Sequence, residues 1–214
     1  MRAPGKVLLL VGSGRLGRST SASLGAYLLR RLREGGWEAE TLQVYTSLRS
    51  TESARGLLDA VRGADLLVVS APLFWVSLPA AVVRALELVA EDRRAAPPPP
   101  GQRFAYLVNS GFPEASQSAT ALAIASRFSR EAGFEWAGGL ALGAGESVQG
   151  RPLERLGRRA RNVRKALDLA AEAFSSGQPI PEDAAAIMAK PLLPAWAYVF
   201  FGGLAWRRRA RPFG

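Results

Sequence analysis

Short apolar runs alternate along the chain with longer segments that carry apolar residues at helical spacing. Apolar runs lie at residues 6–11, 65–71, 104–109 and 134–142, and residues 37–45 alternate between apolar and polar positions. Runs of this length are typical of strands, and a nearly all-apolar run is typical of a strand covered on both faces. The pattern therefore predicts five strands.

A segment with helical periodicity follows each of these strands. In the first, Leu24, Leu28 and Leu32 share one face, and the pair Gly35-Gly36 ends the pattern. The predicted helices cover residues 19–34, 53–62, 79–90, 115–132 and 152–175. Strict alternation of short buried strands with helices favours an α/β domain, in which helices cover both faces of an open parallel sheet.

In such a sheet, ligands bind beyond the carboxyl ends of the strands. The candidate site therefore lies in the loops that follow Val11, Ala71, Asn109 and Leu142.

The loop after the first strand combines glycine, hydroxyl and arginine residues. It runs from Gly12 to Ser21 with the sequence GSGRLGRSTS and opens the first predicted helix. Glycines allow sharp turns, and a helix start offers free amides, so the loop has the content of a phosphate cradle. Gly12, Gly14 and Gly17 also fit a dinucleotide fingerprint, but no acidic residue ends the second strand near Tyr45, which disfavours a dinucleotide site. The alternative is that the hydroxyl groups only cap the helix.

The next two loops join stiff or polar residues to aromatic ones. Residues 72–79 read PLFWVSLP, and the prolines at both ends suit a flat ring held against rigid backbone. Packing against a neighbouring subunit is the alternative for these apolar residues. Residues 109–114 read NSGFPE, which combines polar donors, a glycine turn and an aromatic ring. The fourth loop, GAGE at 143–146, is small enough to allow close approach of its backbone to a ligand.

Taken in order, these loops resemble those of the flavodoxin-like NAD(P)H-dependent FMN reductases and quinone reductases. The resemblance spans about residues 5–176 and rests on the Gly-Ser-x-Arg loop with its Ser-rich helix start, and on the Pro-Leu-Phe loop that leads into a Leu-Pro helix. It implies a flavodoxin-like, doubly wound, five-stranded parallel sheet of order 2-1-3-4-5. It also implies FMN as cofactor, NAD(P)H as cosubstrate, a quinone-like or other small electron acceptor, and commonly a homodimer.

The resemblance assigns cofactor-binding positions in three loops. Matches to the phosphate loop are Ser13, Arg15, Ser19, Thr20 and Ser21; matches to the loop against the isoalloxazine ring are Pro72, Leu73, Phe74 and Trp75; matches to the loop near the polar edge of the ring are Asn109, Ser110 and Gly111. Two positions depart from the family: Gly14 stands where proline is common, and Phe74 stands where tyrosine is common, which removes a hydroxyl near the flavin. Because a flavin carries the hydride chemistry itself, no catalytic side chain is expected.

The composition excludes several other chemistries. The 214 residues include neither cysteine nor histidine. Disulfides, thiolate nucleophiles, Ser-His-Asp triads and zinc sites built on cysteine or histidine are therefore excluded, and no metal site is expected. The N-terminus has no signal-peptide pattern, and no segment has about 20 uninterrupted apolar residues, so a cytoplasmic location is expected.

The formal net charge of +10 bears on partners and on alternative functions. Flavodoxin-type electron carriers tend to be acidic, so the charge argues against that alternative; a non-catalytic FMN-binding or interaction protein is another. Cations cluster at residues 151–165 without interleaved aromatic residues, which indicates a solvated helix face. No nucleic-acid partner is therefore expected.

The sequence divides into a flavin-binding domain at residues 1–178 and an apolar and basic extension at 179–214. The extension is expected to hold a short helix within 179–190, an all-apolar stretch at 195–206 and the sequence RRRAR at 207–211. Twelve residues are too few to span a bilayer. Packing against protein, at the sheet edge, across a dimer or beside the flavin, is expected for this stretch. The alternatives are disorder or peripheral contact with a membrane, with Trp and Tyr at headgroup level and the arginines on anionic lipid.

Overall fold

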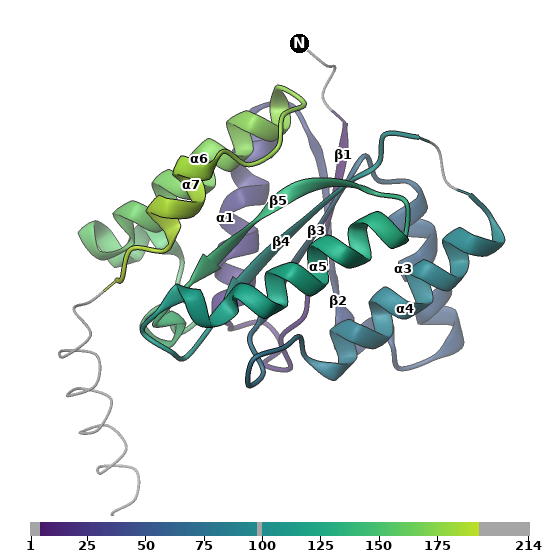
Figure 1. The fold of residues 1–214 in the computed structure, drawn as a ribbon, viewed down its shortest axis with the longest axis horizontal. Helices are drawn as coiled ribbons and strands as arrows, with labels where there is room; N and C mark the ends of the chain where they lie inside the picture. The colour runs from purple at the N-terminus through teal and green to yellow at the C-terminus, as the bar shows by residue number, and fades with distance from the viewer. Residues whose placement is uncertain (1–4, 98–99, 193–214) are drawn as a thin grey trace, which may run out of the picture.

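Five parallel strands form one sheet at the centre of the protein (Figure 1). The structure is a computed structural model, and it describes residues 5–97 and 100–192. The strands are β1 (Lys6–Val11), β2 (Glu38–Gln43), β3 (Leu66–Pro72), β4 (Arg103–Asn109) and β5 (Glu135–Leu142). Their order is β2-β1-β3-β4-β5 and every neighbouring pair is parallel, which confirms the expected flavodoxin-like topology. The chain reverses its direction of winding between β1 and β3, so the switch point lies beyond their carboxyl ends.

Helices cover both faces of the sheet (Figure 1). One face is covered by α1 (Thr20–Glu34), α6 (Arg161–Ser175) and α7 (Glu182–Met188), and the other by α3 (Thr51–Arg62), α4 (Ala80–Ala95) and α5 (Ala119–Glu131). Shorter pieces connect them: α2 (Val44–Ser47) and the 3₁₀ turns η1 (Ala115–Ser118), η2 (Gly145–Ser147) and η3 (Leu153–Ala160).

Alternation along β1 divides the core into two layers. Val7, Leu9 and Val11 pack toward α1 and α6, whereas Leu8 and Leu10 pack toward α3 and α4. All five side chains are buried, and each gains about 1.5–3 kcal/mol on burial. This explains why the strand reads as a continuous apolar run in the sequence.

Three elements differ from the sequence-based expectation. The helix predicted at 115–132 begins with the 3₁₀ turn η1 and continues as α5. The predicted strand at residues 37–45 ends at Gln43, because Val44 already begins α2. The single helix predicted at 152–175 is wrong: the chain forms η3, then α6, with Gly157 at φ 56° and ψ −130° between helical turns. Glycine adopts a positive φ without steric cost, and this conformation interrupts the helical hydrogen bonds.

Residues 179–192 pack against the sheet and α6. The amide of Ile180 donates a hydrogen bond to the carbonyl of Ala137 at 2.8 Å, and its side chain covers Gly138 of β5. Ala184 and Met188 of α7 are buried in the same core layer as α6. The domain boundary after residue 178 stays a prediction, and the apolar stretch at 195–206 lies outside the described residues. Within the described part of the chain, no helix combines the length and apolarity needed to cross a bilayer.

Candidate functional site

A cavity of about 610 Å³ lies at the carboxyl ends of the central strands. Its walls come from the loops that follow β1, β3, β4 and β5, which are the loops that the sequence singled out. All but one of the predicted cofactor-binding residues line it: Ser13, Arg15, Ser19, Thr20, Ser21, Pro72, Leu73, Phe74, Asn109, Ser110 and Gly111. The topology thus brings together residues that are up to about a hundred positions apart in sequence.

Six further residues complete the lining: Gly14, Arg18, Tyr45, Glu146, Gln149 and Gly150. Arg18 and Glu146 belong to loops that the sequence predicts to line the site. Tyr45, Gln149 and Gly150 lie outside those predicted loops, and the tertiary structure brings them to the cavity. Gly150 has a φ of 68°, and a Cβ on it would lie 2.6 Å from the carbonyl carbon of Arg18. Glycine at this position therefore lets the loop after β5 close against the first loop.

The start of α1 presents free backbone amides to the cavity. Ser19 is the N-cap, with extended backbone, and its Oγ accepts a hydrogen bond from the amide of Ala22 at 3.1 Å. Ser19 therefore caps the helix, whereas whether the hydroxyl groups do no more than that stays untested. The cap leaves the amides of Thr20 and Ser21 without partners inside the helix, at the positive end of its dipole. The Ser19 hydroxyl hydrogen is not used by the cap either, so capping and anion binding are compatible.

A buried network fixes this helix start against the neighbouring loops. Asn109 Nδ2 donates to Ser21 Oγ at 2.8 Å and to the carbonyl of Ala71 at 3.2 Å. Thr20 Oγ1 donates to the carbonyl of Gly145 at 2.8 Å, and Ser70 Oγ donates to the carbonyl of Ser21 at 2.8 Å. Because the Thr20 hydroxyl already donates its hydrogen to Gly145, Thr20 would bind an anion through its backbone amide.

The apolar wall of the cavity comes from a tight turn after β3. Phe74 and Ser77 exchange two backbone hydrogen bonds of 2.9 and 3.0 Å, and Trp75 at the tip has a φ of 55°. The amide of Leu73 donates to the carbonyl of Asn109 at 2.7 Å, which anchors the turn to the next loop. This geometry carries the Trp75 side chain outward: it is 89% exposed and is not part of the cavity lining. Its contact with a flavin ring therefore stays a prediction.

Unusual backbone conformations concentrate around the cavity. The described non-glycine residues with positive φ are Trp75, Ala144 and Gln149, and all belong to the loops after β3 and β5. Each such residue costs on the order of 1–3 kcal/mol, which the surrounding packing must offset. Strain of this kind clusters at ligand sites in folded proteins.

The charges of the cavity favour an anion. Arg15 and Arg18 of the first loop line it, against the single carboxylate of Glu146. Arg151 braces the opposite loop, because its Nε and a terminal nitrogen donate to the carbonyls of Val148 and Ser147 at 3.2 and 3.0 Å. The described residues contain no cluster of acidic side chains that could hold a metal ion.

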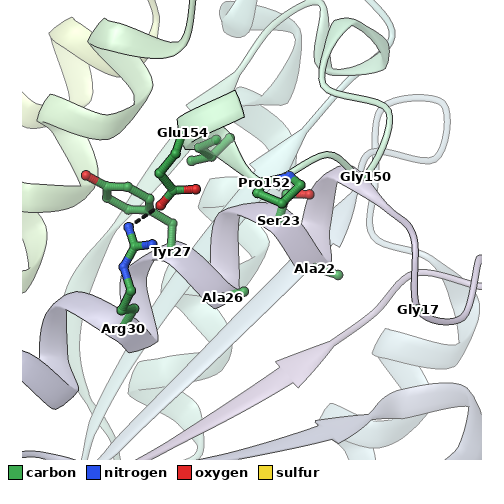
Figure 2. A pocket seen from close by; sticks show the side chains of 10 residues that line it. Gly17, Ala22, Ser23, Ala26, Tyr27, Arg30, Gly150, Pro152 and Glu154 are labelled. Atoms are coloured by element: carbon green, nitrogen blue, oxygen red, sulfur yellow. Dashed lines mark ion pairs between the residues drawn. The ribbon is translucent and has the colours of Figure 1, made fainter. Parts of the chain in front are cut away.

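A second, smaller hollow of about 260 Å³ lies on the outer side of α1 (Figure 2). Ala22, Ala26 and Tyr27 form its floor, and an ion pair between Arg30 and Glu154 closes one end. Partial burial raises the pKa of Glu154, but a backbone hydrogen bond and the pair with Arg30 outweigh burial and hold this pKa below its ordinary value. Arg30 and Glu154 are paired with each other and not available to a ligand. Their ion pair holds the segment around Glu154 against α1.

The topology and the cavity together define a flavodoxin-like α/β protein with a cavity at the switch point. A family model described as "Flavodoxin-like fold" matches residues 5–128, more than half of the chain. The chain belongs to this family. No curated protein sequence matches it significantly.

Solved structures share the fold at low sequence identity. The apo form of an NADH:FMN oxidoreductase is 17% identical, with a TM-score of 0.60, and the match covers 89% of this chain and 96% of that one. An NAD(P)H:quinone oxidoreductase from Methanothermobacter marburgensis is 16% identical, with a TM-score of 0.56, over 81% of this chain and 95% of that one.

A much longer protein shares the fold as well. The rubredoxin:oxygen oxidoreductase from Desulfovibrio gigas is 12% identical over 86% of this chain, with a TM-score of 0.57. This chain spans only 37% of the length of that protein. At such identities the likeness to these structures shows the fold alone.

Proposed function

We propose that this chain is an FMN-dependent NAD(P)H oxidoreductase that serves a quinone-like or other small electron acceptor. The observation that carries the proposal is the cavity at the switch point, where the free amides of a helix start lie opposite an apolar turn. The names of the structural neighbours, an NADH:FMN oxidoreductase and an NAD(P)H:quinone oxidoreductase, support the same kind of reaction.

The residues of the cavity fit FMN by the chemistry of their donors. At one end, the amides of Thr20 and Ser21, the hydroxyls of Ser13 and Ser19, and the guanidinium of Arg15 suit a phosphate. At the other end, the apolar Pro72, Leu73 and Phe74 suit a flat ring. The volume of about 610 Å³ falls within the range of about 300–1,000 Å³ found for cofactor sites.

A bound FMN would supply the redox chemistry, accepting a hydride from the nicotinamide and passing electrons to the acceptor. The chain itself binds and orients. Asn109 and Thr20 hold the helix start at a fixed distance from the loops after β4 and β5. The turn at Phe74 supplies the apolar wall against which a flat ring would lie. A Cβ on Gly111 would meet nothing within 4 Å, so the cavity is open to solvent at this loop.

The proposal is tested by measuring oxidation of NADH and of NADPH by the FMN-loaded protein with a water-soluble quinone. We expect turnover above that of free FMN at the same concentration. Turnover equal to that of free FMN contradicts the proposed activity.

The assignment of the helix start is tested by FMN affinity in a Ser19→Ala/Ser21→Ala double variant. The loss of two hydroxyl groups should weaken binding by ~1–3 kcal/mol in total. Ser50 caps α3 in the same way, with its Oγ accepting from the amide of Ser53 at 3.1 Å, but lies outside the cavity. Ser50→Ala is therefore the control for the loss of a helix cap, and it should leave FMN affinity unchanged. Equal FMN affinity in all three proteins refutes this assignment.

A further inference from the structure

Large apolar side chains gather in the exposed loops around the mouth of the cavity. The exposed large apolar residues of the described chain are Leu16, Phe74, Trp75, Val76, Val83, Phe112 and Ile124. Five of them stand in the loops after β1, β3 and β4, which share the cavity: we call Leu16, Phe74, Trp75, Val76 and Phe112 the rim patch. A gathering of this kind at a functional opening marks an interaction surface.

The most exposed part of the rim patch is held outward by the backbone. Trp75 and Val76 form the tip of the turn closed by the two hydrogen bonds between Phe74 and Ser77. A positive φ is an outlier for a bulky residue such as Trp75, so the turn imposes it. An indole ring presented to water in this way forgoes the free energy of burial, which a partner surface would recover.

Cations flank the rim patch. Arg15 and Arg18 are exposed on either side of Leu16, and neither forms an ion pair with a carboxylate of the described residues. The acids of the four loops are Glu114 and Glu146, and Arg151 adds a third cation. The whole chain carries a net charge of +10, so this surface is not shielded by an acidic remainder.

The described chain ends at the same edge of the molecule. Ala189 and Pro191 line a shallow hollow together with Pro113 and Glu114, the residues that follow Phe112. The sequence beyond, residues 193–214, is rich in Trp, Tyr and Phe and then in Arg. Aromatic and arginine residues in this combination are the composition of segments that bind at the bilayer interface.

We infer that the rim patch docks on the surface of an anionic lipid bilayer. The side chains of Trp75, Val76 and Phe112 would enter the headgroup region, and the guanidinium group of Arg18 would face lipid phosphates. A second copy of the chain is the competing occupant of the same surface. The lipid surface is favoured because the chain as a whole carries a net charge of +10, which opposes association between copies and attracts an anionic bilayer.

Docking in this orientation places the mouth of the cavity against the bilayer. An apolar acceptor dissolved in lipid would then reach the cavity without crossing water. This consequence alone rests on the proposed function, whereas the docking itself rests on the rim patch and its charges.

Vesicle sedimentation with the full chain, without added cofactor, tests the inference. We expect the protein to bind vesicles of phosphatidylglycerol and phosphatidylcholine, and to bind vesicles of phosphatidylcholine alone more weakly. Added salt should weaken binding, because the screening length falls from about 10 Å at 0.1 M to about 3 Å at 1 M. Equal binding to the two vesicle types, or binding to neither, overturns the inference.

Variants in the full chain locate the contact. Trp75→Ser/Val76→Ser should weaken binding to the anionic vesicles about tenfold or more, which corresponds to about 1.4 kcal/mol. Ile124→Ser is the matched control, because Ile124 is 38% exposed on α5 and lies outside the rim patch. A second variant, Val76→Glu, adds an anion at the tip and should also weaken binding. Parent-like binding in both rim variants overturns the inference, since the contact then lies elsewhere.

Sedimentation without lipid distinguishes the competing partner. If the full chain is dimeric and the Trp75→Ser/Val76→Ser variant is monomeric, the rim patch binds a second copy and the inference fails. An unchanged mass in the variant supports the lipid surface. None of these measurements requires FMN or turnover, so their failure leaves the proposed function standing, and failure of the activity assay leaves the docking standing.

Discussion

Replacing Asn109 by alanine tests the link that joins three loops of the cavity. The Asn109 side chain is buried, and its amide nitrogen serves both Ser21 of α1 and the carbonyl of Ala71 at the end of β3. Asn109→Ala removes both hydrogen bonds at once and leaves the buried Ser21 hydroxyl oxygen without its donor.

The cost follows from these contacts. Each neutral hydrogen bond contributes about 0.5–1.5 kcal/mol net, and a buried polar atom left without a partner adds to the loss. We expect Asn109→Ala to lower the free energy of unfolding by about 1–3 kcal/mol. Ser21→Ala should cost less, and it should cost almost nothing once Asn109 is gone. The coupling energy between the two sites should therefore be about 0.5–1.5 kcal/mol.

Urea unfolding of the parent, the two single variants and the double variant measures this coupling. Ser129 supplies a control: it is buried, its hydroxyl donates to the carbonyl of Phe134 at 3.2 Å, and it shares no partner with Asn109. The pair Asn109→Ala and Ser129→Ala should be additive within about 0.3–0.5 kcal/mol. Equal additivity for Asn109 and Ser21 would refute the argument that their hydrogen bond holds the helix start.

Three further expectations follow from the cavity and its surroundings. Gly150→Ala should weaken FMN binding by about tenfold or more, because the new methyl group would press on the backbone at Arg18. Gly177 also has a positive φ, of 73°, but has open space around it, so Gly177→Ala should leave the FMN affinity unchanged. Equal effects of the two substitutions on FMN affinity would contradict this reasoning. Trp75→Ala tests the flavin contact that the sequence predicts. Because the side chain points to solvent in the structure, we expect FMN affinity to change less than twofold in a fluorescence titration, and a tenfold loss would instead support the predicted contact. The depressed pKa of Glu154 stabilises the fold above its unfolded pKa, and this stabilisation is lost as pH falls through the folded pKa. Glu154→Gln should therefore cost at most about 1 kcal/mol at neutral pH, and the difference in the free energy of unfolding between the two proteins should shrink as pH falls through the folded pKa of Glu154. A difference that stays constant on acidification would contradict the assignment.

The sequence was sufficient to predict the sheet and the position of the site. A strand buried on both faces must be apolar throughout, so β1 is found at residues 6–11, where the apolar run lies. The carboxyl ends of parallel strands meet at one edge, so residues as distant as Ser13 and Asn109 could be expected in one cavity. The apolar pattern was enough to locate the strands, and the parallel order of the strands was enough to locate the site at one edge of the sheet.

Other features depend on tertiary contacts that no local pattern reports. Thr20 looked like a free hydroxyl donor, yet its hydrogen bond goes to Gly145, which is 125 positions away. The direction of Trp75 depends on a positive φ inside a two-residue turn. The break at Gly157 interrupts a segment whose helical periodicity continues on both sides. Tyr45 and Gln149 enter the cavity only because the fold brings α2 and the loop after β5 beside the first loop.

The most direct test of the proposed function is the visible absorbance spectrum of the purified full chain, followed by titration of the flavin-free protein with FMN. If the cavity at the switch point holds FMN, one FMN should bind per chain, and the visible absorbance bands of FMN should shift on binding. We expect flavin bands in the purified protein, or saturable binding when FMN is added. A spectrum without flavin bands, together with a titration in which the FMN spectrum and fluorescence do not change, would contradict the claim that this cavity holds FMN.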